Sequence, residues 1–393
     1  MIFLDHNSTT RPDTAVVEAV REALETHWHN PSSVHRAGQE ARRVVELARE
    51  SCAALLGVRP RELTFTSGGT ESIDLAIRGS LAAAPAKQRV IVTTGVEHHA
   101  VRDACDDLAR RGEAQVRLAA VDAAGVVRLD ALRELLTGDV ALVSIQWANN
   151  ETGVVQPVRD VAALCRERGV RFHCDGVQWV GKMPARLGTG PDALDCDLFS
   201  FSAHKFHGPK GAGVLYARPG VRLVPRLHGS QEQGRRGGTE NVPGIAGLGV
   251  AARLAQAWLD GPAQIEIPQL AQRRDAFERA VLGACPDASV NGPPAPAPPA
   301  QRLWNTTNIA FPRLEAEAIL LALSERGVCA SAGAACSSGS LDPSPVILAM
   351  GVPPERAHGS VRFSLSRETT PDELAEAAGI VGEVMARLRA SMP

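Results

Sequence analysis

The segment Phe199-Ser-Phe-Ser-Ala-His-Lys-Phe-His-Gly-Pro-Lys-Gly-Ala-Gly213 joins a short apolar strand to a glycine-rich turn. We expect the strand to deliver Ser202, His204 and Lys205 to one edge of a sheet. Burial lowers the pKa of a lysine and makes its neutral amine available for Schiff-base chemistry. An ordinary loop lysine is the alternative. Of the four lysines in the chain, only Lys205 has a strand behind it and hydroxyl and imidazole neighbours beside it.

The sequence around this segment alternates between apolar runs of strand length and helical patterns. Continuous β-rich runs separated by helices indicate a mostly parallel sheet covered by helices on both faces, which is α/β architecture. The expected strands lie at 63–65, 89–93, 140–146, 170–174 and 198–202, and the expected helices at 72–81, 101–111 and 158–168.

The last third of the chain predicts a smaller α+β unit. Residues 291–300 (NGPPAPAPPA) form a proline-rich loop with no regular structure. Beyond it we expect strands at 307–311 and 360–365, and helices at 315–325 and from Thr370, as N-cap, to about 390. We therefore predict a large domain over residues 16–255. Residues 1–15 and 256–393 form a small domain that carries a cysteine loop at about 329–342.

Charge and cysteine content exclude several classes of protein. The chain has 42 Lys and Arg against 44 Asp and Glu, and this balance gives no basic field for nucleic acid. The eight cysteines are dispersed without a C-x-x-C pair, which argues against a disulfide scaffold and a zinc ribbon. No secretory leader and no apolar run of membrane-spanning length occur. We expect a cytoplasmic protein with no metal, nucleic-acid or membrane partner.

Three polar stretches follow predicted strands, at the edge of the sheet where a ligand is expected. Thr66-Ser-Gly-Gly-Thr-Glu-Ser72 leads into a helix whose first amides could bind phosphate; an ordinary capped turn is the alternative. His173-Cys-Asp-Gly-Val-Gln178 places Asp175 where a carboxylate could hold a pyridinium nitrogen protonated, or could cap a helix. Trp147-Ala-Asn-Asn-Glu-Thr-Gly153 directs amides at the same crevice, or is a common turn.

Three single residues are further candidates. His98, in Glu97-His-His-Ala100, could stack on a flat ring, although a lone histidine is more often structural. Cys336 lies in Ser331-Ala-Gly-Ala-Ala-Cys-Ser-Ser-Gly-Ser340, whose small residues predict an accessible, mobile thiol; an inert free cysteine is the alternative. Arg362 sits inside an apolar strand and needs an anionic partner, which is either a substrate carboxylate or a structural ion pair.

Because these features follow one another in a set order, the sequence resembles the cysteine desulfurases of the nitrogen-fixation and iron–sulfur-assembly type. The resemblance covers nearly the whole chain. It rests on Leu4-Asp-His-Asn-Ser-Thr-Thr10, Asn30-Pro-Ser-Ser33, Phe65-Thr-Ser-Gly-Gly-Thr-Glu-Ser72, Ala148-Asn-Asn-Glu-Thr-Gly153, Gly234-Arg-Arg-Gly-Gly-Thr-Glu-Asn241 and Val361-Arg-Phe-Ser-Leu-Ser366. It implies a class-V aminotransferase-like enzyme of fold type I that binds pyridoxal 5′-phosphate and forms a homodimer.

The resemblance also implies roles for individual residues. Lys205 would hold the cofactor as a Schiff base, and Cys336 would take the sulfur of L-cysteine as a persulfide and pass it to a protein acceptor. Asn150 and Arg362 would hold the substrate carboxylate. Thr239 would reach the phosphate of the partner subunit. The other contacts to the cofactor would be His98 on its ring, Asp175 on its nitrogen, Gln178 on its phenolic oxygen, Thr70, Ser202 and His204 on its phosphate, and Gly69 and Asn150 nearby.

The chain departs from the family pattern in places. Ala332 and Ala334 replace serines of the cysteine loop, and Ala203 replaces the usual glycine before the His-Lys pair. The segment Gly229-Ser-Gln-Glu-Gln233 lacks the usual second glycine and the arginine after the glutamate, and the proline-rich insert is atypical. These changes bear on the choice of acceptor more than on the chemistry.

Two alternatives remain open at this point. One is a different reaction on the same fold, such as that of a selenocysteine lyase, a cysteine sulfinate desulfinase or another β-eliminating lyase, which needs Lys205 but not Cys336. The other is a non-enzymatic sulfur-relay or scaffold protein, and the intact Lys205, Asp175 and Arg362 argue against it.

Overall fold

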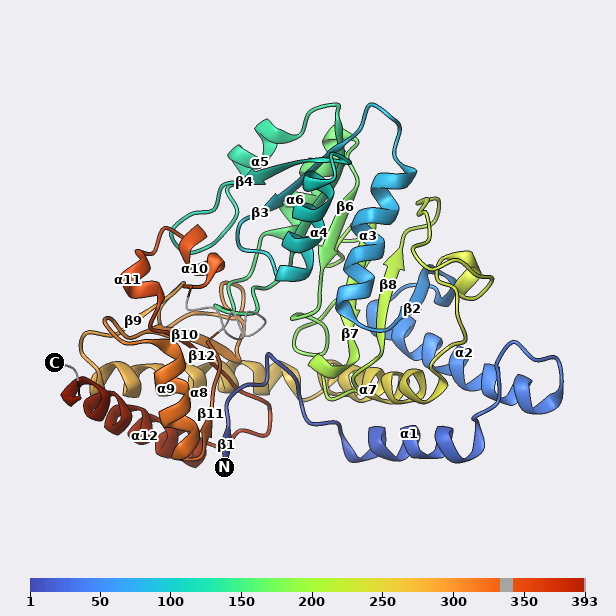
Figure 1. Ribbon diagram of the computed structural model, residues 1–393. Helices are drawn as coiled ribbons and strands as arrows, with labels where there is room; N and C mark the ends of the chain where they lie inside the picture. The colour runs from blue at the N-terminus through green and yellow to red at the C-terminus, as the bar shows by residue number, and fades with distance from the viewer. Residues whose placement is uncertain (333–341, 392–393) are drawn as a thin grey trace.

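The computed structural model describes residues 1–332 and 342–391. Its larger part is a seven-stranded sheet with the order β2-β8-β7-β6-β5-β3-β4 (Figure 1). Six strands run parallel, and β8 alone runs antiparallel to its two neighbours. The α/β class with a mostly parallel sheet is therefore confirmed. The strands are β2 (Leu63–Thr66), β3 (Val90–Thr94), β4 (Gln115–Ala119), β5 (Val140–Gln146), β6 (Phe172–Asp175), β7 (Leu198–Ser202) and β8 (Gly213–Ala217).

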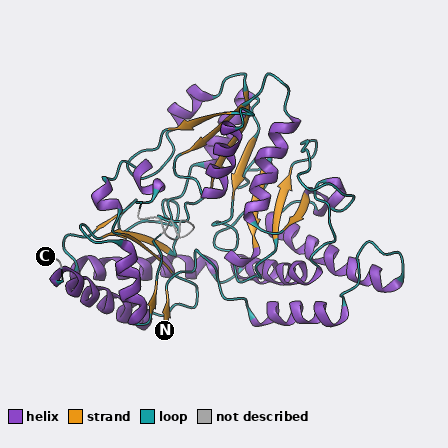
Figure 2. Ribbon diagram, in the orientation of Figure 1, coloured by secondary structure: helices purple, strands orange, loops and turns teal. Residues whose placement is uncertain are grey.

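Helices cover both faces of this sheet (Figure 2). One face packs against α3 (Gly69–Ala83) and α4 (His99–Arg110). The other packs against α6 (Val158–Arg168) and α7 (Val242–Asp260). Strands β3, β5, β6 and β7 are buried along their whole length. Strands β3 and β5 accordingly begin with apolar runs, whereas β6 and β7 contain the buried polar pair His173 and Ser200, whose Nε2 and Oγ are 2.9 Å apart. Three further helices complete this part: α1 (Thr14–Thr26), α2 (Arg36–Leu56) and α5 (Leu129–Leu135).

Helix α7 is the most apolar long helix of the larger part. Within the described residues it is the one helix whose length and composition would suit a membrane span, and 61% of its most apolar window is buried. It packs along α1 and α2, so its apolar surface serves the protein core.

The smaller part has its own apolar core, which includes Phe277, Phe311 and Phe363. Its main sheet is antiparallel with the order β12-β10-β9, and β1 pairs with β11. Thr370 caps the last helix and forms a capping box with Glu373, as the sequence predicted. The division at residues 15 and 255 remains a prediction. The elements are β1 (Ile2–Phe3), α8 (Ala263–Ala284), β9 (Ser289–Val290), β10 (Thr306–Ala310), α9 (Ala316–Glu325), β11 (Val328–Cys329), α10 (Pro345–Ala349), α11 (Pro354–Ala357), β12 (Ser360–Ser364) and α12 (Pro371–Ala390).

The proline-rich tract 291–300 contains no helix or strand, as expected. Buried charges on α8 hold it in place. Arg274 donates to the carbonyl oxygen of Ala297, and Glu278 accepts from the amide of Ala295 at 2.7 Å. Arg302 pairs with the same Glu278 at 2.7 Å. The tract is therefore bonded to the helix beneath it rather than projecting from the surface.

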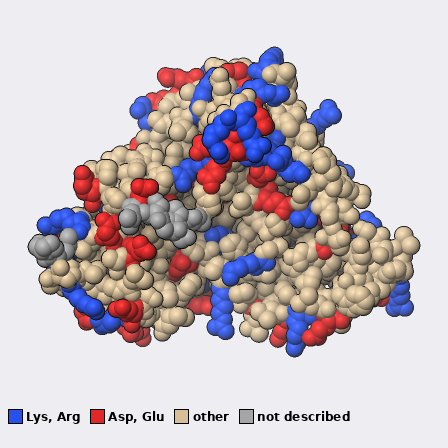
Figure 3. Space-filling model, viewed as in Figure 1, with Lys and Arg blue, Asp and Glu red and all other residues tan. Residues whose placement is uncertain are grey.

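On the face shown in Figure 3, acidic and basic side chains are interspersed over the larger part. This agrees with the nearly balanced net charge of −2.

Candidate active site

A cavity of about 640 Å³ opens where β5, β6 and β7 end, and ten of the twelve predicted site residues line it. Thr239 lies instead in a small surface pocket with Arg236 and Asn241. Cys336 lies outside the described residues. The carboxyl ends of neighbouring parallel strands meet at one edge, which explains why loops far apart in sequence converge here. The ten are Gly69, Thr70, His98, Asn150, Asp175, Gln178, Ser202, His204, Lys205 and Arg362.

Lys205 ends a short 3₁₀ turn directly after the buried strand β7. Its Nζ donates to the carbonyl oxygens of Asn7 and Ser8, at 2.6 and 2.9 Å. The N-terminal segment thus lies against the lysine that the sequence singled out. Asn7 is buried, and its side-chain nitrogen Nδ2 donates to the carbonyl oxygen of Asn150 at 3.1 Å. Sequence reasoning assigned no role to Asn7 or Ser8, because nothing local to residues 4–10 indicates where they lie.

A second lysine, Lys182, is fully buried beside this site. Its Nζ donates to Asn7 Oδ1 at 2.9 Å and to Gln178 Oε1 at 2.6 Å. Burial lowers its pKa well below the usual range, and the nearby charges of Lys205 and Arg362 act in the same direction. Because Lys182 occupies Gln178 Oε1, only Nε2 of Gln178 can donate; it donates one proton to the carbonyl oxygen of Asn7 at 3.0 Å and has a second proton for a ligand. The four-residue spacing of Gln178 and Lys182, one helical turn, was the available signal.

Asp175 ends β6 and is buried. Burial raises the pKa of its carboxyl to about 6, opposed by a hydrogen bond from the amide of Val177 and by the charge of Lys205. A buried carboxylate without an ion-pair partner among the described residues favours a cationic ligand atom.

His98 has the structural role that the sequence left open, and its stacking on a ring remains a prediction. It is the N-cap of α4 and accepts from the amide of Ala100 through Nδ1 at 3.2 Å. It also lines the cavity. Burial lowers its pKa to about 3, so the ring is neutral at physiological pH. Since Nδ1 accepts a hydrogen bond, the ring proton is on Nε2.

The start of α3 forms an anion-binding corner. Its N-cap is Gly68, which supplies no side-chain acceptor, so the first amides of the helix are available to a ligand. A Cβ on Gly69 would lie 2.8 Å from Val177, because the helix start packs tightly against the turn after β6. Ser202 Oγ is buried and has no hydrogen-bond partner in the described part of the chain. An unsatisfied hydroxyl beside a helix N-terminus fits a phosphate group.

Arg362 forms an ion pair, which is the structural alternative that the sequence left open, and it also lines the cavity. Its Nη2 donates to Asp5 Oδ1 at 2.6 Å and to Ser8 Oγ at 2.7 Å, and its Nη1 donates to the carbonyl of Asn150 at 3.0 Å. Its Nε is buried and has no partner among residues 1–332 and 342–391. The guanidinium therefore has an ion pair and an unused donor.

The two asparagines of the turn 147–153 have different roles. Asn149 closes the turn, because its Oδ1 accepts from the amides of Glu151 and Thr152 at 2.8 Å. Asn150 lines the cavity, and its Oδ1 is buried without a partner among the described residues. Only one of the two amides is thus available to a ligand. Glu151, the acid of this predicted turn, also lines the cavity, and the lining residues that the sequence did not single out include Ser8, His99, Arg102 and Gln146.

Comparison with known proteins agrees with this geometry. Residues 2–376 match the class-V aminotransferase family. A cysteine desulfurase of Trichormus azollae is 47% identical over 394 aligned residues, covering 100% of this chain and 95% of that protein. Among solved structures, a NifS-like protein superposes with a TM-score of 0.88 at 35% identity, covering 98% of this chain and 99% of the other. SspA in complex with cysteine superposes with a TM-score of 0.79 at 30% identity, covering 94% and 100%.

The fold and the cavity thus define a member of the class-V aminotransferase family, which depends on pyridoxal phosphate. Within that family, the chain belongs to the cysteine desulfurases. The predicted family and the predicted fold type are both confirmed.

Proposed function

We propose that this protein removes the sulfur of L-cysteine, releases L-alanine, and holds the sulfur as a persulfide on Cys336 for transfer to a protein acceptor. The observation that carries the proposal is the convergence of Lys205, Asp175 and Arg362 on one cavity. An amine, a buried carboxylate and a guanidinium are the groups needed to hold the cofactor, its ring nitrogen and the substrate carboxylate.

The residues present fit pyridoxal phosphate. The phosphate would bind at the start of α3 with Thr70, Ser202 and His204, where the hydroxyl of Ser202 lacks a partner in the described structure. Asp175 would hold the ring nitrogen, the neutral ring of His98 would lie against the cofactor, and Gln178 would donate to the phenolic oxygen. When bound, the cofactor supplies an electron sink for the carbanion formed at the substrate Cα.

Lys205 has two tasks in this proposal. Its amine holds the cofactor until the substrate amine replaces it, and the freed amine then takes the Cα proton of cysteine. Asn7 and Ser8, whose carbonyls accept from Nζ, keep this amine at the edge of the cavity. Arg362 would bind the substrate carboxylate through Nε, which has no partner in the described structure, and Asn150 would bind it through its side-chain amide nitrogen.

The thiolate of Cys336 then attacks the sulfur of the substrate. A sulfur–sulfur bond forms and the carbon–sulfur bond breaks, its electron pair staying on Cβ, which takes up a proton to give alanine. The ammonium that Lys205 forms when it takes the Cα proton would be the acid for this step, and the neutral ring of His98 lines the same cavity. The sulfur leaves as the persulfide of Cys336, so a thiol acceptor regenerates the enzyme.

The remaining parts of the proposal concern assembly and location. Thr239 lies outside the cavity of its own chain, which supports a homodimer in which it serves the cofactor phosphate of the partner. Six of the seven described cysteines are buried, and all seven are free, which supports a reducing, cytoplasmic location.

Alanine formation from L-cysteine, with a reductant present, tests this function. We expect alanine from the wild type and none from Cys336→Ala, which should keep the absorbance of the bound cofactor. Equal alanine from both proteins would rule out a persulfide on Cys336 and favour a plain lyase. No alanine from either, with cofactor bound, would exclude cysteine as the substrate.

A further inference from the structure

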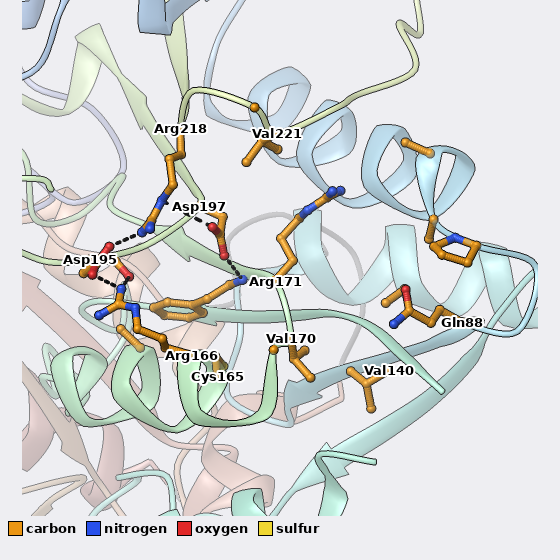
Figure 4. Close-up of a pocket in the computed structure, with 18 residues that line it drawn as sticks. Gln88, Val140, Cys165, Arg166, Val170, Arg171, Asp195, Asp197, Arg218 and Val221 are labelled. Atoms are coloured by element: carbon orange, nitrogen blue, oxygen red, sulfur yellow. Dashed lines mark hydrogen bonds and ion pairs between the residues drawn. The ribbon is translucent and has the colours of Figure 1, made fainter. Parts of the chain in front are cut away.

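A second cavity, of about 380 Å³, lies at the opposite edge of the central sheet (Figure 4). It opens where β5 and β6 begin and where α3 and α6 end. Its lining includes Gln88, Val140, Arg171 and Val221. None of the residues that line the first cavity belongs to it, so it is separate from the candidate active site.

Five charged side chains line this cavity: Arg166, Arg171 and Arg218 against Asp195 and Asp197. Two of the arginines are neutralised. Asp195 pairs with both Arg166 and Arg218. Asp197 accepts from the amide of Phe172 at 2.8 Å and pairs with Nε of Arg218 at 3.3 Å. Three positive and two negative charges leave the lining with one uncompensated positive charge.

That charge is the guanidinium of Arg171. In Figure 4 its side chain points away from the ion-paired group formed by Asp195, Arg166 and Arg218. Its hydrogen bond among the described residues is to a carbonyl oxygen, that of Arg222, at 3.3 Å. No ion pair joins it to a carboxylate of the described chain; burial lowers its pKa, and the more distant charge of Asp197 only partly opposes this shift. A half-buried guanidinium without an anionic partner favours an anion.

The rest of the lining limits the kind of anion. Pro85 and Val221 add apolar surface to a mostly polar lining, and the side-chain amide of Gln88 makes no hydrogen bond to the described residues. The C-terminal ends of α3 and α6 point their carbonyls at this edge and oppose a second negative charge. A single negative charge on an apolar body suits these surroundings better than a phosphate dianion.

We propose that this cavity binds a small organic monocarboxylate. Its carboxylate would accept from Arg171 and Gln88, and its apolar body would pack against Pro85 and Val221. The volume is within the range of small-molecule sites. This is a binding site distinct from the one that would hold L-cysteine.

Fluorine NMR with 4-fluorobenzoate as the probe, on the cofactor-loaded full chain, tests the site. We expect saturable binding that Arg171→Gln weakens at least about tenfold, since a charge-assisted bidentate contact is lost. Gln88→Glu should weaken binding as well, because it gives Arg171 an anionic partner while keeping the arginine. The neutral 4-fluorobenzamide should not bind. Arg168→Gln is the matched control, because Arg168 is exposed on the same helix end and does not line the cavity.

Arg362→Gln separates the two cavities. If it abolishes probe binding while Arg171→Gln does not, the probe occupies the active site and the proposal is wrong. Absence of binding at millimolar probe, or equal displacement by inorganic phosphate, would also overturn it. Cofactor absorbance and the melting temperature of each variant show whether it is folded. If Arg171→Gln does not fold, Gln88→Glu alone tests the site.

Discussion

The hydroxyl of Ser344 donates a hydrogen bond to Oε2 of Glu151 at 2.6 Å, and both side chains are buried. Ser344 is also the N-cap of α10, and Glu151 belongs to the turn that presents Asn150 to the cavity. Burial raises the pKa of Glu151. Ser344 comes eight residues after Cys336 in sequence, so this bond ties the chain that follows the cysteine loop to the turn proposed to bind the substrate.

Ser344→Ala should therefore slow sulfur removal without loss of the cofactor. It leaves a buried carboxyl without its donor, which costs about 1–3 kcal/mol of stability. Misplacement of reacting groups lowers rates steeply, so we expect alanine formation to fall on the order of tenfold or more. Ser344→Thr keeps the hydroxyl and should retain most of the rate. Equal rates for the wild type and Ser344→Ala would show that the bond does not position the reacting groups.

Arg362→Lys should raise the KM for L-cysteine. One ammonium group lacks the planar fork that lets Arg362 bond Asp5, Ser8 and the carbonyl of Asn150 and still offer a donor to the substrate. We expect KM to increase by about tenfold or more, with the cofactor absorbance unchanged. Arg326→Lys, which alters an exposed ion pair with Glu383, is the control. A KM equal to that of the wild type would exclude a contact between Arg362 and the substrate.

Lys182→Met tests whether the buried amine orients Gln178. The substitution keeps the length of the side chain but removes the donor to Gln178 Oε1, so the amide is held only by the bond from Nε2 to the carbonyl oxygen of Asn7. If Gln178 donates to the phenolic oxygen of the cofactor, the pH dependence of the cofactor absorbance should shift. Lys87→Met, at an exposed lysine, should leave it unchanged. An unshifted titration in Lys182→Met would mean that Lys182 acts only in packing.

Asp175→Asn should stabilise the apoenzyme while abolishing activity. Burial raises the pKa of Asp175 to about 6 from the usual 3.8. A carboxyl whose pKa is raised by folding binds its proton more tightly in the folded state. Its contribution to stability is therefore complete below about pH 4 and is lost as the pH rises through 6.

The wild-type apoenzyme should thus lose on the order of 3 kcal/mol from this group between pH 4 and pH 7, and Asp175→Asn should lack that loss. Urea unfolding of both apoproteins at several pH values in this range measures the difference. If the free energies of unfolding of the two apoproteins change with pH in parallel, folding does not raise the pKa of Asp175. Asn also removes the negative charge proposed to hold the ring nitrogen, so activity should disappear.

Local patterns were sufficient to predict the sheet and much of the cavity. Strands β5 and β7 and helix α6 have the predicted bounds, because buried parallel strands are continuous apolar runs and α6 ends at a glycine. The loops after β5, β6 and β7 carry the residues that were predicted to meet, since strand ends share one edge. Helix α3 begins three residues before the predicted start, because Gly69 and Thr70 are already helical.

The parts that could not be predicted depend on contacts between distant residues. Arg362 pairs with Asp5 across 357 positions, and Lys182 bonds Asn7 across 175. No spacing or periodicity within either segment shows such pairings. The sequence left an ion pair and a substrate contact as alternatives for Arg362, whereas the folded chain gives that side chain both an ionic partner and a place on the cavity wall.

The two ends of the chain meet at the cavity: the amide of Asn7 donates to Ser364 Oγ at 2.9 Å, and the amide of Ser364 donates to the carbonyl of Leu4 at 2.7 Å. During synthesis, Asn7 therefore leaves the ribosome 357 residues before its partner Ser364 in β12. The central sheet can form earlier, because its strands are complete by residue 217. The segment that holds Lys205, residues 7 and 8, is anchored only after β12 has been made. We therefore expect cofactor binding to follow folding of the large sheet instead of guiding it.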